Sequence, residues 1–275
     1  MDYLEIDRIT RPERRASHSP EHQARLVVAP GDFAATSPFL LMAEDWFQPP
    51  AGFPDHPHRG LQTVTIVLEG ALEHRDHTGA KGSLGAGDVQ WMTAGRGVIH
   101  SEMPGEGGAH TLQLWLNLPA QHKMAEASYH DQSEASTPIS SGPGYELRVY
   151  AGRHDDVELA YASLWPMMLI DARVEGEKRV EVEVPAGYRA FLYVLSGRGR
   201  LEGDDTAFAE EDVVWFKPAH APRLIGLEAD IDVRALLFGG PAIDEPVFAH
   251  GPFVMNTVEE IRQAYADYRA GRLAG

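Results

Sequence analysis

The sequence predicts an all-β protein with two tandem β-barrel domains and one short C-terminal helix. Three observations lead to this prediction. Short apolar runs are separated by many of the 27 glycines and 19 prolines, and this spacing indicates short strands joined by turns. The two halves of the chain carry similar strand patterns. A convincing helical pattern occurs only near the C-terminus.

Five apolar runs have the length and the flanking turn residues expected of strands. They are Thr63–Leu68, Val89–Met92, Thr111–Leu116, Arg189–Leu195 and Asp212–Phe216. Many short strands of this kind are typical of a β-sandwich or a β-barrel.

An internal repeat relates the strands of the two halves. Ile66–Gly70 resembles Tyr193–Gly197, since each is an apolar strand that ends at a turn glycine. Asp88–Met92 follows the first segment, and Asp212–Phe216 follows the second at a similar separation. Two similar domains explain this pattern better than one large barrel.

The boundary between the domains is expected in His130–Gly144, where Ser, Thr, Gly and Pro cluster. Such a composition is typical of a linker. We therefore expect a metal-binding domain over residues 1–132. A second domain without metal, ending in the helix, is expected over residues 133–275.

The C-terminal helix is predicted from its start signal and its periodicity. Thr257 is a suitable N-cap, and Glu260 stands three residues further on, as in a capping box. Apolar and aromatic side chains then recur at helical spacing at Ile261, Ala264, Tyr265 and Tyr268. The helix is expected to end near Gly271.

Charge and cysteine content exclude several classes of function. The formal net charge is −17, from 24 basic and 41 acidic residues, which disfavours direct contact with nucleic acid or an anionic membrane. No cysteine is present, so disulfides, thiolate metal sites and thiol nucleophiles are excluded. The opening MDYLEIDRITRPERR lacks the apolar segment of a signal peptide. We expect a cytoplasmic location.

Two short motifs predict a metal site. In an extended segment, side chains two residues apart point to the same face, so His56 and His58 can share one ion. His100 and Glu102 form a second pair of the same spacing. Three imidazoles and one carboxylate suit a divalent first-row metal with open coordination positions. Iron(II), manganese, nickel and copper all fit this donor set, and zinc is also admissible.

Several longer segments resemble the pirin family, a branch of the cupins. They are FPDHPHRG, TVTIVLEG, GDVQWMTAGRGVIHSEMP, LQLWLNLP and EPVFAHGPFVMNTVEEIRQAYADYRAGRL. The resemblance extends from about Pro38 to Leu273 and implies a bicupin of two jelly-roll barrels. It further implies one iron, held in the N-terminal barrel by His56, His58, His100 and Glu102.

The resemblance also implies an activity and an alternative to it. The activity is that of a quercetin 2,3-dioxygenase, which opens the ring of a flavonol with O₂ and releases carbon monoxide. Glu102 would then accept the proton of the flavonol 3-hydroxyl. The alternative is an iron-binding, redox-sensing regulator that binds transcription factors or metabolic enzymes. An oxygenase for another substrate is a third interpretation.

The second repeat and a histidine-rich segment are not predicted to bind metal. Counting the same offsets in the second half places Glu183 and Pro185 opposite the first histidine pair. Leu224 and Gly226 stand where His100 and Glu102 would be, which offers no ligand set. The segment from His74 to Gly79 is expected to be a polar hairpin turn outside the site.

Overall fold

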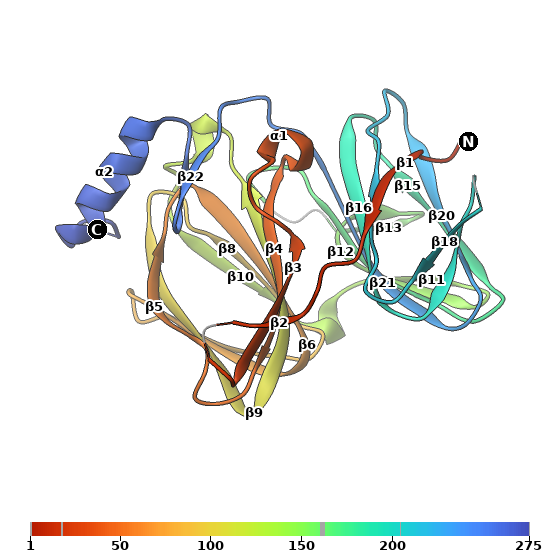
Figure 1. Cartoon of the computed structure of the whole chain (residues 1–275), viewed down its shortest axis with the longest axis horizontal. Coiled ribbons are helices and arrows are strands. Elements are labelled where there is room, and N and C mark those ends of the chain that lie inside the picture. Colours follow the sequence, from red (N-terminus) through yellow and green to blue (C-terminus); the bar gives the residue numbers. More distant parts are fainter. Residues whose placement is uncertain (1, 18, 160–162, 204, 275) are drawn as a thin grey trace. The chain divides into compact units, whose positions relative to one another are not determined.

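The protein consists of two compact β-sheet units, which Figure 1 shows in a computed structural model. The structure describes residues 2–17, 19–159, 163–203 and 205–274. The first barrel is formed by Glu13–Ala135 together with Ile243–Gly275. The second barrel is formed by Met1–Pro12 together with Ser136–Ala242. The prediction of an all-β fold is confirmed.

The first barrel is built on a nine-stranded sheet with the central order β10-β8-β6-β9-β4-β3-β2, in which β5 pairs with β9 and β7 with β6. A separate hairpin joins β22 to β23. The strands are β2 Arg15–Ala16, β3 His22–Val28, β4 Phe39–Phe47, β5 Phe53–His58, β6 Leu61–Asp76, β7 Lys81–Gly85, β8 Val89–Thr93, β9 Val98–Asn117, β10 Ser128–Gln132, β22 Phe248–His250 and β23 Phe253–Met255.

The second barrel has an eight-stranded sheet, β1-β19-β16-β21-β14-β12-β11 with β13 beside β12, and a four-stranded sheet, β15-β20-β17-β18. Aliphatic side chains from both sheets form its buried core. The strands are β1 Ile6–Thr10, β11 Ile139–Gly142, β12 Tyr145–His154, β13 Val157–Leu159, β14 Met168–Val174, β15 Arg179–Val184, β16 Tyr188–Ser196, β17 Arg198–Leu201, β18 Thr206–Ala209, β19 Val213–Phe216, β20 Arg223–Ala229 and β21 Val233–Pro241.

The units differ from the predicted ranges at both ends of the chain. Strand β1 pairs with β19 of the second barrel, and the segment after residue 242 joins the first barrel. Only the internal boundary, after Ala135, lies close to the predicted one at residue 132. Local sequence patterns assign a terminal segment to its neighbours in the chain, whereas strand pairing assigned it to an edge far away in sequence.

The internal repeat is visible in the backbone of both barrels. Gly70 and Gly197 both have positive φ, and a Cβ at either position would lie about 2 Å from a backbone carbonyl oxygen. Trp91 pairs with β6 as Trp215 pairs with β16, and both indoles are buried. The two halves therefore have equivalent turns and equivalent core tryptophans.

The helices are few and short, as predicted. Helix α2 spans Val258–Arg269, and the Thr257 side chain accepts a hydrogen bond from the Glu260 backbone N–H. The remaining helical turns are α1 Phe33–Thr36, η1 Ala120–His122 and η2 Glu134–Ser136. Among the residues that the structure describes, no helix has the length and apolar character needed to cross a membrane.

Candidate metal centre

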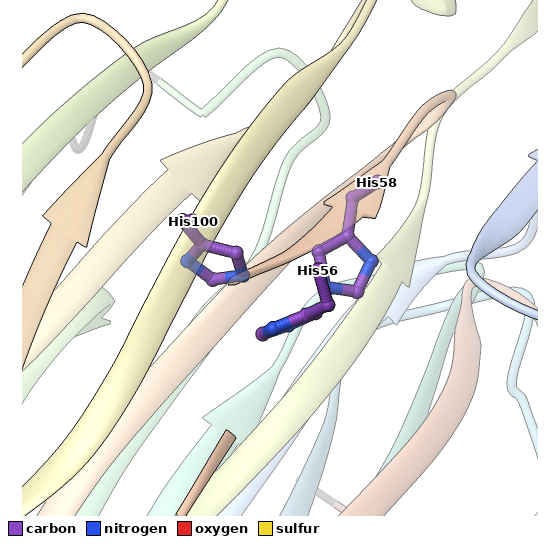
Figure 2. A group of neighbouring side chains, drawn as sticks. All are labelled: His56, His58 and His100. Atoms are coloured by element: carbon purple, nitrogen blue, oxygen red, sulfur yellow. The ribbon is translucent and has the colours of Figure 1, made fainter. Parts of the chain in front are cut away.

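Two strands of the first barrel bring the predicted histidines together. His56 and His58 lie on β5, and His56 is the direct cross-strand partner of His100 on β9. Directly opposed residues of an antiparallel pair hold their side chains on one face, about 5 Å apart at Cβ. Figure 2 shows the resulting group of three imidazoles, two from β5 and one from β9.

The geometry of this group fits a shared ion. One ring nitrogen from each histidine can be chosen so that all three lie within 4.8 Å of one another. The side chains of His58 and His100 are almost completely buried. Neither ring nitrogen of His100 has a hydrogen-bond partner within the described part of the chain, and His58 has the Pro252 backbone beside one of its two nitrogens. Since buried polar atoms are normally paired, unpaired nitrogens on two adjacent buried rings are consistent with a shared metal ion.

Burial favours the neutral, metal-binding form of two of the three imidazoles, those of His58 and His100. Burial, followed by the neighbouring imidazoles, lowers the pKa of His58 well below its usual range. The same causes lower the pKa of His100 to about 2. His56 Nδ1 lies 2.9 Å from the Pro54 carbonyl oxygen, which can only accept. His56 Nδ1 therefore donates its N–H to this oxygen, which leaves Nε2 as the ring nitrogen that can bind an ion.

Glu102 lies beside the three histidines and is itself held by hydrogen bonds. Its Oε2 is 4.0 Å from His100 Nε2 and accepts a 2.7 Å hydrogen bond from Gln113 Nε2. Its Oε1 accepts a longer one, 3.3 Å, from the Thr65 hydroxyl. The carboxylate is buried but is not within the 4.8 Å group. Glu102 as a metal ligand therefore stays a prediction.

Gln113 and Trp115 belong to the site, although the sequence analysis did not single them out. Gln113 Oε1 accepts a hydrogen bond of 3.3 Å from Trp115 Nε1, and the Trp115 ring packs edge-on against His58. The two residues are two apart in the predicted strand Thr111–Leu116. That alternation was the available signal, since it places both on the same face of β9.

The predicted turn after His74 is only partly correct. Asp76 does close a turn, because its Oδ1 accepts hydrogen bonds from the backbone N–H groups of Thr78 and Ala80. His74 instead lies within β6, buried, with its ring 5.4 Å from that of His100. It also packs against Tyr129, at a ring distance of 4.6 Å. Burial lowers the pKa of His74. Burial, followed by the nearby Asp76 carboxylate and its hydrogen bond to the phenol, raises the pKa of Tyr129.

Arg59 anchors the C-terminal segment next to the site. Its side chain is buried, and Nη1 donates to Asp267 of α2 at 2.8 Å. The other two guanidinium nitrogens, Nε and Nη2, donate to the carbonyl oxygens of Arg96 and Leu273. The Arg59 guanidinium is also the main reason why the pKa of the Asp267 carboxyl is lowered. Arg59 thus connects the loop after β5 to the end of α2.

The corresponding strands of the second barrel present a different surface. Glu183 on β15 pairs with Leu224 on β20, as His56 pairs with His100, so the sequence count found a matching pair. Glu183 is exposed, however, and its neighbours Val182 and Ile225 belong to the apolar core. These two positions offer one exposed carboxylate and no imidazole, and the absence of metal from the second barrel stays a prediction.

Comparison with known protein families agrees with the two barrels. Residues 15–116 match the family model described as Pirin. Residues 169–274 match the model described as Pirin C-terminal cupin domain. The two matches cover most of both barrels and confirm the bicupin fold.

Individual relatives cover nearly the whole chain. Pirin-like protein 2 of Arabidopsis thaliana is 41% identical over 86% of this chain and 75% of its own. A Pseudomonas aeruginosa protein provisionally named as a quercetin 2,3-dioxygenase is 39% identical over 86% of this chain and 87% of its own. The crystal structure of quercetin 2,3-dioxygenase from Acinetobacter baumannii aligns with a TM-score of 0.88, at 28% identity over 99% of both chains. With both family models matched and relatives this similar, the chain belongs to the pirin family.

Proposed function

We propose that this protein is a metal-dependent dioxygenase of the quercetin 2,3-dioxygenase type, with its ion held by His56, His58, His100 and Glu102. The observation that carries the proposal is the group of three imidazoles with one nitrogen each within 4.8 Å of the others, two of them buried on His58 and His100. The names of the Pseudomonas and Acinetobacter relatives support the choice of reaction. The substrate class is a planar aromatic flavonol, used together with O₂.

The donor set fits a first-row metal ion. Three neutral nitrogens and one carboxylate, without sulfur, bind iron(II), manganese, nickel, copper or zinc. We propose iron(II). When bound, the ion would supply a Lewis-acid centre that lowers the pKa of a substrate hydroxyl and holds the reactants together.

In this proposal Glu102 takes up the substrate proton. Its Oε2 is occupied by the short hydrogen bond from Gln113. Its Oε1 carries only the longer contact from Thr65 and is the more available oxygen. Oε1 would accept the proton of the flavonol 3-hydroxyl, which makes the ring electron-rich for reaction with O₂.

Aromatic side chains around the histidines supply an apolar wall. Trp115 packs on His58 at a ring distance of 5.1 Å, and Phe53 packs on His56 at 5.9 Å. Such a wall suits a planar aromatic substrate and limits the access of water to the reacting groups.

Metal analysis combined with gas measurements tests the proposal. The protein loaded with iron(II) should consume O₂ and release carbon monoxide in equal amounts when quercetin is added. A flavone without the 3-hydroxyl should be inert, because it offers no proton to Glu102 and cannot bind the ion in the same way. Metal-free protein provides the control, since flavonols also oxidise slowly without a catalyst. Equal rates with and without metal would contradict the proposal.

A further inference from the structure

A groove of about 530 Å³ lies between helix α2 and strand β22 of the first barrel, which are neighbours in Figure 1. Strand β22 contributes Phe248–His250 to its lining. The helix contributes side chains at the spacing that places them on one helical face. They are Val258, Ile261, Arg262, Tyr265, Ala266 and Arg269. None of the residues that line the groove is a proposed metal ligand.

Exposed apolar side chains gather at this groove. Phe248 and Val258, which line it, are 42% and 40% exposed, and Tyr268 on the same helix is 39% exposed. These are three of the eight large hydrophobic side chains that are exposed in the described part of the chain. Isolated exposed apolar residues are ordinary, but a cluster marks an interaction surface. Ile261 is buried in the apolar cluster that attaches α2 to the barrel, so the groove belongs to a fixed surface.

The charges around the groove are basic, although the chain as a whole carries a net charge of −17. Both charged side chains in the lining are arginines. Arg262 pairs with Glu259, but both side chains of that pair are exposed, so a partner's carboxylate can replace Glu259 at little cost. The Arg269 guanidinium lies 5.9 Å from the centre of the Tyr265 ring and makes no ion pair with a described residue. The groove therefore complements an acidic partner.

The spacing of the two arginines indicates the form of that partner. Arg262 and Arg269 are seven residues apart on α2, which corresponds to about 10 Å along the helix axis. Carboxylates seven residues apart on a second helix have the same separation. Ala266 lies between the arginines in the sequence and lines the groove. Because its side chain is small, a second helix can approach closely there.

We infer that this groove binds an amphipathic helix of a partner protein, whose apolar face contacts Phe248 and Val258 and whose flanking carboxylates pair with Arg262 and Arg269. Helix-in-groove recognition of this kind reads apolar anchors at helical spacing and uses flanking charges for orientation. The inference goes beyond the proposed oxygenase reaction and does not depend on it.

Fluorescence anisotropy with the metal-loaded protein at about 0.15 M salt tests the groove. The probe is a labelled helical peptide of about 16 residues that repeats Leu-Glu-Glu-Leu, compared with the same peptide carrying Lys in place of Glu. The protein should bind the glutamate peptide about tenfold more tightly, although its net charge favours the lysine peptide. Arg269→Glu should weaken binding of the glutamate peptide about five- to tenfold. Phe248→Ala should weaken it about fivefold.

Arg198→Glu is the matched control, because it makes the same charge change at an exposed arginine of the second barrel, and it should leave the affinity within twofold of wild type. Equal affinity for the two peptides, or for the glutamate peptide in wild type and Arg269→Glu, would overturn the inference. Self-association in sedimentation that Arg269→Glu abolishes would overturn it by assigning the groove to a second copy of the chain. Binding to phosphatidylserine vesicles that Arg269→Glu abolishes would assign it to a membrane surface instead.

Discussion

Glu102 is the side chain on which the proposed reaction depends most. Four side chains meet around it: His100, Gln113 and Thr65 by distance or hydrogen bond, and His74 by strand pairing. A carboxylate held in this way keeps one orientation while a substrate approaches. Gln113 stabilises the ionised form, because hydrogen bonds donated to a carboxylate favour its charge.

Replacing Glu102 should affect turnover more than folding. Glu102→Gln keeps the shape but removes the basic oxygen, so O₂ consumption with quercetin should fall about 10²-fold, as for a lost general base. Metal should remain bound with reduced affinity. Glu106→Gln is the control, because Glu106 is an exposed residue of the same strand. Unchanged turnover at full metal occupancy would show that Glu102 is not the base.

The buried histidines should make the metal-free protein sensitive to acid. In the folded state the pKa of His100 is about 2, against about 6.5 in the unfolded chain. The unfolded state therefore binds the proton first, and the free energy of unfolding falls as the pH drops below 6.5. The expected loss is about 1.4 kcal/mol per pH unit for His100 alone.

Urea denaturation of the metal-free protein between pH 7.5 and 4.5 measures this loss. His100→Gln should flatten the dependence, because the glutamine side chain does not titrate. The same slope in the wild type and in His100→Gln would show that the imidazole of His100 is not buried in the neutral form.

Among the elements, helix α2 depends on one buried ion pair for its position. Arg59 and Asp267 are 5% and 18% exposed in their side chains. Apolar contacts around Phe253, Ile261 and Leu273 complete the attachment. Because Arg59 follows His58 directly, the helix is tied to the strand that carries two of the proposed ligands.

Removing the acid of this pair should loosen the helix. Asp267→Asn leaves the Arg59 charge buried without a counter-charge, at a cost of about 2 kcal/mol or more. Hydrogen exchange should accelerate within α2 more than in β16 of the second barrel. Glu259→Gln is the control, because it breaks only an exposed pair with Arg262 on the same helix, worth little. Equal exchange in both variants would contradict the role of the buried pair.

Over the whole molecule, the two barrels share strands, turns and core tryptophans but not the polar site. At matching positions the first barrel has His56 paired with His100, and the second has Glu183 paired with Leu224. The neighbouring Val182 and Ile225 belong to the apolar core of the second barrel. The repeat therefore supports one active barrel and one barrel whose interior serves packing.

Metal should bind at one ion per chain. Elemental analysis of the loaded protein should give a molar ratio of metal to protein near one. The double variant His58→Ala, His100→Ala should bind no metal. His220 is an exposed histidine of the second barrel. His220→Ala should therefore leave the ratio of metal to protein unchanged. A ratio near two, or metal retained in the double variant, would contradict the assignment.

The sequence by itself determined the features that are local in the chain. Strand positions followed from apolar runs, and helix α2 followed from Thr257 and the periodicity after it. The histidine group was predictable from the pairs His56/His58 and His100/Glu102. Within each pair both side chains point to one face of a strand, so the group forms when the two strands are neighbours. The repeated segments Asp88–Met92 and Asp212–Phe216 were recognisable in the sequence, and each carries a buried tryptophan.

Only the tertiary structure decided which distant segments lie together. Terminal strand β1 belongs to the second barrel because the edge of β19 accepts it. His74 was expected in a turn, but strand β6 continues through it, and its ring packs near those of His100 and Tyr129. Strand register is set by pairing between residues far apart in the chain. Local sequence patterns do not specify that pairing. The residues that surround the predicted ligands could therefore be identified only from the structure.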